Sequence, residues 1–341
     1  MTYLFYNQDC ISGAQEHLAD NSVDLIITDP PYGISGDKLD KHYNRNESFV
    51  IDGYVEIPQA EYAEFSMNWI KQAERVLKPG GALYVVSGYT NLIDILNALR
   101  ETSLKEVNHI IWKYNFGVYT KTKYISSHYH ILYYVKPKAK HTFNTFARYA
   151  DHERSDKGGS ANYEDREDVW VINREYKPGQ VKNKNELPTA LLTKMIQYSS
   201  QEGDMVCDFF LGSFSTAKVA KGLNRKAVGF EISQNAFDHQ LQEINALEVG
   251  YLQDTIRRPP ENQYFNQGKP IEDDERAAIA KDFQALIDKG STKKKAIDAL
   301  SQQYGRGYWS ILRVVDGTTN KSANPNKNDS PKNSTNQGDL F

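Results

Sequence analysis

Cysteine and long apolar runs are both scarce in this sequence of 341 residues. Its two cysteines, Cys10 and Cys207, provide neither a disulfide framework nor the spacing of a zinc site, which fits a reducing compartment. No apolar run approaches the roughly 18 residues that a membrane helix needs, and no basic segment precedes the aromatic start at Tyr3. These absences argue against a membrane protein and a conventionally secreted one, so we expect a cytoplasmic protein.

An excess of either charge is also absent, because 41 lysines and arginines face 44 aspartates and glutamates, for a net charge of −3. This balance excludes a histone-like protein but permits a local surface for nucleic acid. The hydrophobic content of 39% is enough for a sizeable core, which excludes wholesale disorder. At roughly 100–200 residues per domain, the length suggests one large domain with an appendage, or two domains.

Residues 1–250 alternate between strand-like and helix-like patterns, which predicts an α/β fold with a mostly parallel sheet covered on both faces. The predicted strands are Tyr3–Asn7, Val23–Thr28, Ala82–Ser87, Val107–Trp112, His130–Val135, Met205–Phe209 and Lys226–Glu231. The predicted helices are Gln59–Leu77, Leu92–Leu99 with Asn91 as its cap, Pro188–Ser199, Ser215–Leu223 and Asn235–Leu247.

Two other regions break this alternation. Residues 138–184 are polar with few periodic apolar positions, and we interpret them as an insertion. Residues 251–318 form a helical appendage with predicted helices at Asp273–Lys289, Lys293–Tyr304 and Tyr308–Val315, the second capped by Thr292. Residues 319–341 consist mainly of Asn, Ser, Lys and Pro before an apolar end, which predicts a disordered tail.

Four residues, Asp29-Pro30-Pro31-Tyr32, directly follow the predicted strand Val23–Thr28, at the end where open α/β sheets bind ligands. The Asp29 carboxylate and the Pro30 carbonyl can accept the two hydrogens of an exocyclic amine on a base and draw its nitrogen toward tetrahedral geometry. The prolines stiffen the loop, and the Tyr32 ring can stack on the base for roughly 1–3 kcal/mol. A plain proline turn, with Asp29 as a cap and Tyr32 in the core, is the alternative.

These four residues resemble the catalytic motif of S-adenosylmethionine-dependent DNA amino-methyltransferases. Aspartate in the first position is usual in adenine-specific members, so the resemblance implies methylation of adenine N6 on a flipped base. It also implies a Rossmann-like methyltransferase fold with a seven-stranded, mostly parallel sheet that includes a late antiparallel strand. S-adenosylmethionine is the expected cofactor, and no metal is expected.

A second segment, Asp208–Thr216, runs from a predicted strand into a helix, where backbone amides can approach a ligand. It resembles the family's cofactor loop, Asp-Pro-Phe-x-Gly-x-Gly-Thr-Thr, with Phe209 for the proline and Phe214 for the second glycine. Phe214 places a large side chain where a positive φ is expected, which brings cofactor geometry into question. Beyond this loop, Glu231 ends the next strand and can accept hydrogen bonds from a ribose diol. A generic nucleotide-binding unit, or merely a tight turn, is the alternative.

The catalytic motif precedes the cofactor loop, which is the circularly permuted order of the β-group of this family. By the same resemblance, residues 1–137 are the catalytic half and residues 185–250 the cofactor-binding half. Lys78–Tyr84 and Ser127–Leu132 resemble two further family segments. The resemblance implies these cofactor-binding residues: Asp9, Cys10, Asn185, Asp208, Phe210, Gly212, Ser213, Ser215, Thr216 and Glu231.

A basic stretch spans Val107 to Ala150, where no acidic residue occurs. This local bias suits contact with the phosphates of double-stranded DNA, although a solvated basic face is the alternative. By analogy with the β-group, residues 138–184 would recognise the target sequence. The predicted DNA-binding residues are Lys113, Lys121, Lys123, Lys136, Lys138, Lys140 and Arg148.

The end of the chain suggests further partners. The region 293–315 fits a helix-turn-helix, a packing appendage or a dimerisation element equally well. The terminal residues Gln337, Asp339, Leu340 and Phe341 resemble the peptide by which bacterial replication and repair proteins dock on the sliding clamp, and chance is the alternative for so short a motif.

The sequence therefore predicts a site-specific adenine-N6 DNA methyltransferase of the cytoplasm, acting in restriction-modification. Two alternatives stay open at this point. The same fold methylates cytosine N4 in related enzymes or could act on RNA, and a degenerate protein of this fold would bind nucleic acid without catalysis.

Overall fold

The computed structural model describes residues 2–31, 57–115, 117, 119–150, 153–175, 186–257, 266 and 270–322, the last five without their side chains. The chain divides into two compact units, unit 1 at Met1–Arg258 and unit 2 at Pro259–Phe341, and each is described by itself. Tyr32, Asn185 and the residues of the terminal docking motif lie outside the described residues, so their predicted roles stay predictions.

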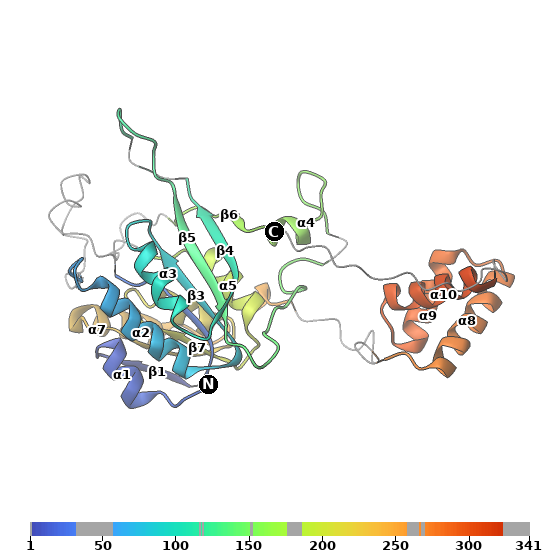
Figure 1. The fold of residues 1–341 in the computed structure, drawn as a ribbon, viewed down its shortest axis with the longest axis horizontal. Coiled ribbons are helices and arrows are strands. Elements are labelled where there is room, and N and C mark those ends of the chain that lie inside the picture. Colours follow the sequence, from blue (N-terminus) through green and yellow to red (C-terminus); the bar gives the residue numbers. More distant parts are fainter. Residues whose placement is uncertain are drawn as a thin grey trace, which may run out of the picture. The chain divides into compact units, whose positions relative to one another are not determined.

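Unit 1 is built on an eight-stranded sheet with the strand order β1-β8-β7-β2-β3-β5-β4-β6 (Figure 1). The strands are β1 (Tyr3–Tyr6), β2 (Val23–Thr28), β3 (Leu77–Ser87), β4 (Lys105–Lys113), β5 (His128–Val135), β6 (Val169–Val171), β7 (Met205–Asp208) and β8 (Lys226–Phe230). Of these strands, only β5 runs antiparallel to its neighbours, β3 and β4, and the other pairings are parallel. The predicted α/β fold with a late antiparallel strand is confirmed.

The sheet has one more strand than the seven predicted. The additional strand, β6, belongs to the 138–184 segment and pairs in parallel with β4, with Trp170 beside Trp112. Its three residues alternate between exposed and buried, a pattern too short to recognise in sequence. The predicted insertion therefore contributes to the sheet itself.

Helices cover both faces of the sheet, as its side-chain pattern requires. One face carries α1 (Cys10–His17), α2 (Tyr62–Val76) and α3 (Leu92–Arg100), and the other carries α5 (Thr189–Ser199), α6 (Ser215–Gly222) and α7 (Gln234–Ala246). In β2, Ile26 points to the first face while Leu25 and Ile27 point to the second, because successive side chains of a strand alternate. Hydrophobic runs buried on both sides are typical of such sheets.

Several predicted boundaries need correction. β3 begins at Leu77, because α2 leads directly into the strand instead of stopping in the Lys78–Gly81 turn. Asn91 occupies the N-cap position of α3, but its buried side chain makes no capping hydrogen bond. Helix α1 was not predicted at all.

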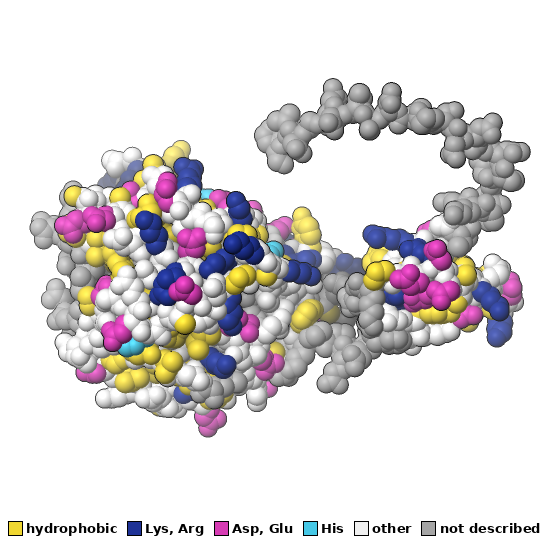
Figure 2. Space-filling model, turned by 60° about the horizontal axis from the view of Figure 1, so that its bottom comes forward, with side chains coloured by type: hydrophobic (Ala, Val, Ile, Leu, Met, Phe, Trp, Pro, Cys, Tyr) yellow, Lys and Arg dark blue, Asp and Glu magenta, His cyan; other side chains and the backbone are white. Residues whose placement is uncertain are grey.

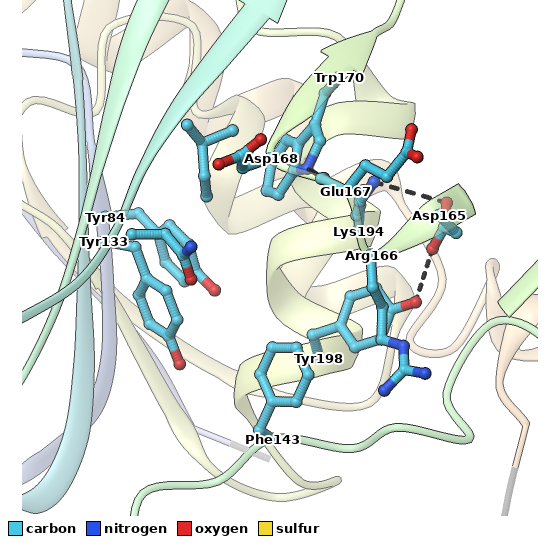
Figure 3. Close-up of a pocket in the computed structure, with 12 residues that line it drawn as sticks. Tyr84, Tyr133, Phe143, Asp165, Arg166, Glu167, Asp168, Trp170, Lys194 and Tyr198 are labelled. Atoms are coloured by element: carbon cyan, nitrogen blue, oxygen red, sulfur yellow. Dashed lines mark hydrogen bonds and ion pairs between the residues drawn. The ribbon is translucent and has the colours of Figure 1, made fainter. Parts of the chain in front are cut away.

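The 138–184 segment is held against α5 by one acidic residue. Asp165, at the end of the short helix α4 (Ala161–Asp165), accepts hydrogen bonds from Arg148 (Nε, 2.9 Å) and from the Tyr198 hydroxyl (2.6 Å). The Lys194 ammonium lies 3.5 Å from the other carboxylate oxygen of Asp165 and 4.4 Å from the centre of the Trp170 ring (Figure 3). Burial lowers the pKa of Lys194 to about 8. These contacts anchor the segment to unit 1.

Unit 2 is a three-helix unit of α8 (Asp273–Asp288), α9 (Lys293–Tyr304) and α10 (Tyr308–Ser322). Its own core is formed by Ile279, Ile297, Leu300, Ile311, Val314 and Val315. The Thr292 side chain accepts a hydrogen bond from the Lys295 amide, which confirms the predicted cap. The predicted boundary at residue 251 is wrong, because the 3-10 helix Gln253–Thr255 packs on unit 1, where Gln197 donates to the Thr255 carbonyl (2.8 Å). None of the helices within the described ranges is long and apolar enough to cross a membrane.

Candidate active site at the carboxyl edge of the sheet

The catalytic and cofactor motifs meet at the carboxyl ends of two neighbouring strands. β2 and β7 pair in parallel, with Ile26 beside Cys207, so the loops that follow them emerge side by side. The Thr28 hydroxyl donates a 2.9 Å hydrogen bond to a carboxylate oxygen of Asp208. The two motifs, far apart in the sequence, therefore lie side by side at the carboxyl edge of the sheet, where open α/β sheets bind ligands.

The catalytic loop is anchored by helix α2. Asp29 is half-buried and Pro30 is buried at the end of β2. The hydroxyl of Tyr62, a residue only 1% exposed, donates a 2.9 Å hydrogen bond to the Pro31 carbonyl. The loop backbone is thus fixed from the side of the helix as well as by its prolines.

Helix α2 also contacts the cofactor loop. The ring of Phe65 lies 5.8 Å from that of Phe210, and the Trp69 ring lies edge-on to Phe210 at 5.5 Å. Tyr62 and Phe65 were predicted only as part of an apolar helix face. Their position one turn apart on that face was the available signal, but the pattern does not reveal which loops the face covers.

Asp208 is the most strongly buried acid of the site, at 5% exposure. Burial raises its pKa to about 7, although hydrogen bonds from the Phe210 amide, Thr216 and Thr28 oppose this shift. The Phe210 amide bond is 3.0 Å long. Asp208 thus holds the start of the cofactor loop in place from inside the protein.

Two residues of the cofactor loop have a left-handed backbone conformation, Gly212 (φ +48°) and Phe214 (φ +57°). The Phe214 ring is fully buried and packs 5.0 Å from the Phe5 ring and 5.8 Å from the Phe237 ring. A left-handed conformation costs a non-glycine residue roughly 1–2 kcal/mol, which the buried phenyl ring offsets. The loop therefore keeps the turn that a glycine would allow, and its large side chain points into the core.

Glu231 fastens this loop to the adjacent strand. One of its carboxylate oxygens accepts from the Gly212 amide and the other from the Ser233 amide, each at 2.8 Å. Burial raises the pKa of Glu231, against the effect of these backbone bonds. Its oxygens retain further lone pairs for the ribose hydroxyls predicted from the sequence.

The remaining predicted cofactor residues lie nearby. β1 pairs with β8, so Asp9-Cys10 follow β1 beside the end of β8, where the Gln8 amide donates to the Glu231 carbonyl (3.1 Å). Asp9 caps α1 through the amides of Ile11 and Ser12. Cys10 is buried in the core of the α1–α3 face, and this burial raises the pKa of its thiol well above its usual value, which disfavours the thiolate form of a nucleophile.

The start of helix α6 carries the three predicted hydroxyl residues of the loop. Ser213 and Ser215 share a 2.6 Å hydrogen bond, and Ser215 donates to Glu186 (3.2 Å). Thr216 is buried and bonds Asp208. Within the part of the 183–188 segment that the structure describes, Glu186 contacts the cofactor loop.

The predicted DNA-binding residues do not form one surface. Lys113, Lys121 and Lys123 are exposed at the carboxyl edge, where the segment between β4 and β5 projects beyond the sheet (Figure 1). Lys138 and Lys140 are exposed at the opposite edge, because the antiparallel strand β5 returns the chain there.

Two of the seven basic residues also make contacts within the fold. The Lys136 ammonium donates to the carbonyls of Glu74 (2.7 Å) and Leu77 (2.8 Å) and so caps the end of α2. Arg148 belongs to the Asp165 anchor described above.

A small cavity lies apart from this edge, beneath α5 (Figure 3). Its walls include Tyr84 and Tyr133, which stack at 4.4 Å in the middle of the sheet. A free volume of about 40 Å³ holds water molecules but not a nucleoside. It therefore belongs to the anchoring of the 138–184 segment and not to the candidate site.

Comparison with known proteins agrees with this geometry. A family model described as DNA methylase, of the N6/N4 type, matches residues 23–243. The type II methyltransferase M.HpaI of Haemophilus parainfluenzae is 30% identical over 260 residues, which cover 72% of this chain and 76% of that protein. The type II methyltransferase M.BamHI of Bacillus amyloliquefaciens is 32% identical over 245 residues, which cover 67% of this chain but only 54% of M.BamHI.

Solved structures share the fold. The M1.HpyAVI–SAM complex superposes with a TM-score of 0.51 and 22% identity over 72% of this chain and all of that one. The PvuII DNA methyltransferase, a cytosine-N4-specific protein, superposes with a TM-score of 0.54 and 16% identity over 75% of this chain and 91% of that one. The family match ends before unit 2 begins.

Proposed function

The chain belongs to the N6/N4 DNA methylase family, and from this premise we propose that it transfers a methyl group from S-adenosylmethionine to the N6 amine of adenine in double-stranded DNA. The observation that carries the proposal is the contact between Thr28 and Asp208, because it brings the predicted amine-binding loop and the predicted cofactor loop together. Transfer between two substrates requires both to be held at one place.

The cofactor loop fits S-adenosylmethionine. The space beside Gly212 is open, since a Cβ placed there would meet nothing closer than the Phe210 carbonyl at 3.9 Å. Phe214, the residue that raised doubt in the sequence, is turned away into the core. Glu231 would hold the ribose hydroxyls, with Asp9-Cys10 beside the adenine and Asn185 near the amino-acid end. When bound, the cofactor supplies an electrophilic methyl group on a sulfonium.

The residues of the chain prepare the amine. The Asp29 carboxylate and the Pro30 carbonyl accept the two amine hydrogens, which localises the nitrogen lone pair that the base ring otherwise delocalises. Tyr62 keeps the loop in place by its bond to the Pro31 carbonyl. Tyr32 stacks on the flipped base, and the amine proton leaves to solvent or to Asp29 after transfer. No covalent enzyme intermediate is needed, which agrees with two buried cysteines.

The choice of adenine depends on Asp29, because aspartate in this position resembles the adenine-specific form of the motif. Cytosine N4 is the second candidate base, since its exocyclic amine poses the same chemical problem and the family includes both types. A non-catalytic protein is disfavoured by the buried position of Phe214, which leaves the cofactor side of the loop open.

For DNA contact we retain the exposed lysines at the carboxyl edge, Lys113, Lys121 and Lys123. They lie on the edge that carries Asp29, so phosphates beside a flipped base come within their reach. Lys138 and Lys140, on the opposite edge, would contact DNA only away from the reacting base. Docking of the terminal motif on a sliding clamp is a separate proposal, to be tested by binding of that clamp to chains with and without residues 337–341.

The direct test incubates the purified chain with plasmid DNA of mixed sequence and S-adenosylmethionine labelled in the methyl group, followed by nucleoside analysis. Labelled N6-methyldeoxyadenosine is expected, and Asp29→Ala should abolish it. Labelled N4-methyldeoxycytidine would identify cytosine, and not adenine, as the target base. No label on DNA, together with no binding of the cofactor in calorimetry, would refute the proposal and leave a binding protein.

A further inference from the structure

Helices α9 and α10 of unit 2 are joined by a turn of three residues, 305–307. Gly305 ends α9 in the left-handed conformation (φ +58°), and the next amide, that of Arg306, donates to the Ser301 carbonyl (3.0 Å). Glycine at this position permits a sharp change of direction between two helices. A short glycine turn between two helices that share a core is the arrangement of a helix-turn-helix.

The turn is rigid because Arg306 is locked beneath it. This side chain is only 4% exposed, and its guanidinium makes a two-point ion pair with Glu275 of α8, at 3.0 and 2.6 Å. It also donates to the Pro270 carbonyl (2.9 Å). The burial of Arg306 and its bonds to α8 show that it organises the unit. α10 is therefore held in a fixed direction relative to α8 and α9.

The outer face of α10 is left uncovered by the other helices of the unit. Trp309 is 72% exposed and Arg313, four residues later on the same face, is also exposed. Asp316, one turn further, forms an ion pair with the Lys293 ammonium at 2.6 Å. This contact brings the start of α9, with exposed Lys294 and Lys295, next to the same face.

Charge is distributed unevenly over the unit. Between Ala299 and Val315 no acidic residue occurs, whereas α8 begins with the acidic run 272–275. On the face of unit 2 seen in Figure 2, basic and acidic side chains gather in separate groups. The α10 face thus combines an exposed aromatic ring, an arginine and neighbouring lysines, the composition typical of nucleic-acid contact.

We infer that unit 2 is a second DNA-binding module, a helix-turn-helix whose helix α10 contacts double-stranded DNA through Trp309 and Arg313, with Lys294 and Lys295 on the phosphates. A duplex has the required complementary charge, and its major groove admits an α-helix. In a two-fold dimer through this face, a second copy would bring an equally basic face and repel it. The choice of DNA rests on the proposed function, but binding by unit 2 needs no methyl transfer.

The test measures binding of the full chain to a fluorescent random-sequence duplex by anisotropy, over a range of salt concentrations and without cofactor. Arg313→Glu should weaken binding about tenfold or more and flatten the dependence of affinity on salt, since contacts to phosphates are lost. Lys294→Glu should act in the same direction. Lys281→Glu makes the same charge change at an exposed position of α8 and should leave affinity within about twofold.

Other outcomes would overturn the inference. Equal weakening by Lys281→Glu would indicate a general charge effect, and unchanged affinity in Arg313→Glu would show that α10 does not contact DNA. If the native chain is an oligomer and Trp309→Ala is a monomer that still binds DNA with the native affinity, the α10 face is a contact between chains. Thermal melting of each variant distinguishes loss of contact from loss of folding, and methyl transfer measured in parallel reports on the proposed function independently.

Discussion

The hydroxyl of Thr28 and the carboxylate of Asp208 are joined by a 2.9 Å hydrogen bond between neighbouring strands. Thr28 immediately precedes the catalytic loop and Asp208 begins the cofactor loop. Because both residues are buried, the bond is shielded from water and contributes more than an exposed one. The protonation of Asp208 therefore affects hydrogen bonds to both loops.

Stability should depend on pH through Asp208. Its pKa is raised to about 7 in the folded chain, above the value near 3.8 of a free side chain, so the folded state binds this proton more tightly. The stabilisation is complete below the lower value and is lost as pH rises through about 7. In urea denaturation, the native chain should exceed Asp208→Asn in stability by more at pH 5 than at pH 8. A constant difference between the two pH values would contradict the assignment.

Removal of the Tyr62 hydroxyl should affect catalysis more than folding. Tyr62→Phe deletes the bond to the Pro31 carbonyl but keeps the ring, so a stability loss of about 1 kcal/mol is expected. The catalytic rate should fall about tenfold through misplacement of the Pro30 carbonyl, with little change in KM for the cofactor. Tyr134→Phe, which removes a comparable hydrogen bond from β5 to Glu106 of β4, is the matched control and should retain the native rate.

The left-handed backbone at residue 214 should reverse the usual order of alanine and glycine. Both Phe214→Ala and Phe214→Gly remove the buried ring, which costs about 3 kcal/mol or more. The glycine variant relieves the strained φ, so it should be more stable than the alanine variant by about 1 kcal/mol. Chemical denaturation of the two variants measures this difference directly, and greater stability of the alanine variant would show that the backbone is unstrained.

Loss of the Asp165 charge should loosen the 138–184 segment. Asp165→Asn leaves the buried Lys194 without its ionised partner, and about 3 kcal/mol of destabilisation is expected. Limited proteolysis should then cut within residues 138–184 before other parts of unit 1. Asp168→Asn removes an exposed carboxylate three residues away and serves as the control, for which unchanged proteolysis is expected.

The sequence predicted the elements that carry the two motifs, because strand patterns and the loops after β2 and β7 are local features. That the two loops lie side by side depends on the strand order, which the local pattern does not give. The strand that leads to Glu231 followed from the same reasoning as the two motifs, and β8 ends at Phe230, directly before Glu231. Contacts set by tertiary packing were not predictable from local pattern, such as the bond from Tyr62 to a loop far along the chain and the engagement of Lys136 by the end of α2.

The strand pattern contains the signal that separates the basic residues into two groups. An antiparallel strand at His128–Val135 places the residues before and after it on opposite edges of the sheet. The basic residues 113–123 and 136–140 therefore had to separate, although they are neighbours in sequence. β6 is the contrary case, since three residues carry too little pattern to predict a strand.

Helix α2 holds the catalytic loop through Tyr62 and the cofactor loop through Phe65. One helix thus supports two loops that are far apart in the sequence. A substitution that displaces α2 would therefore move both loops together, so its effects on them would not be separable.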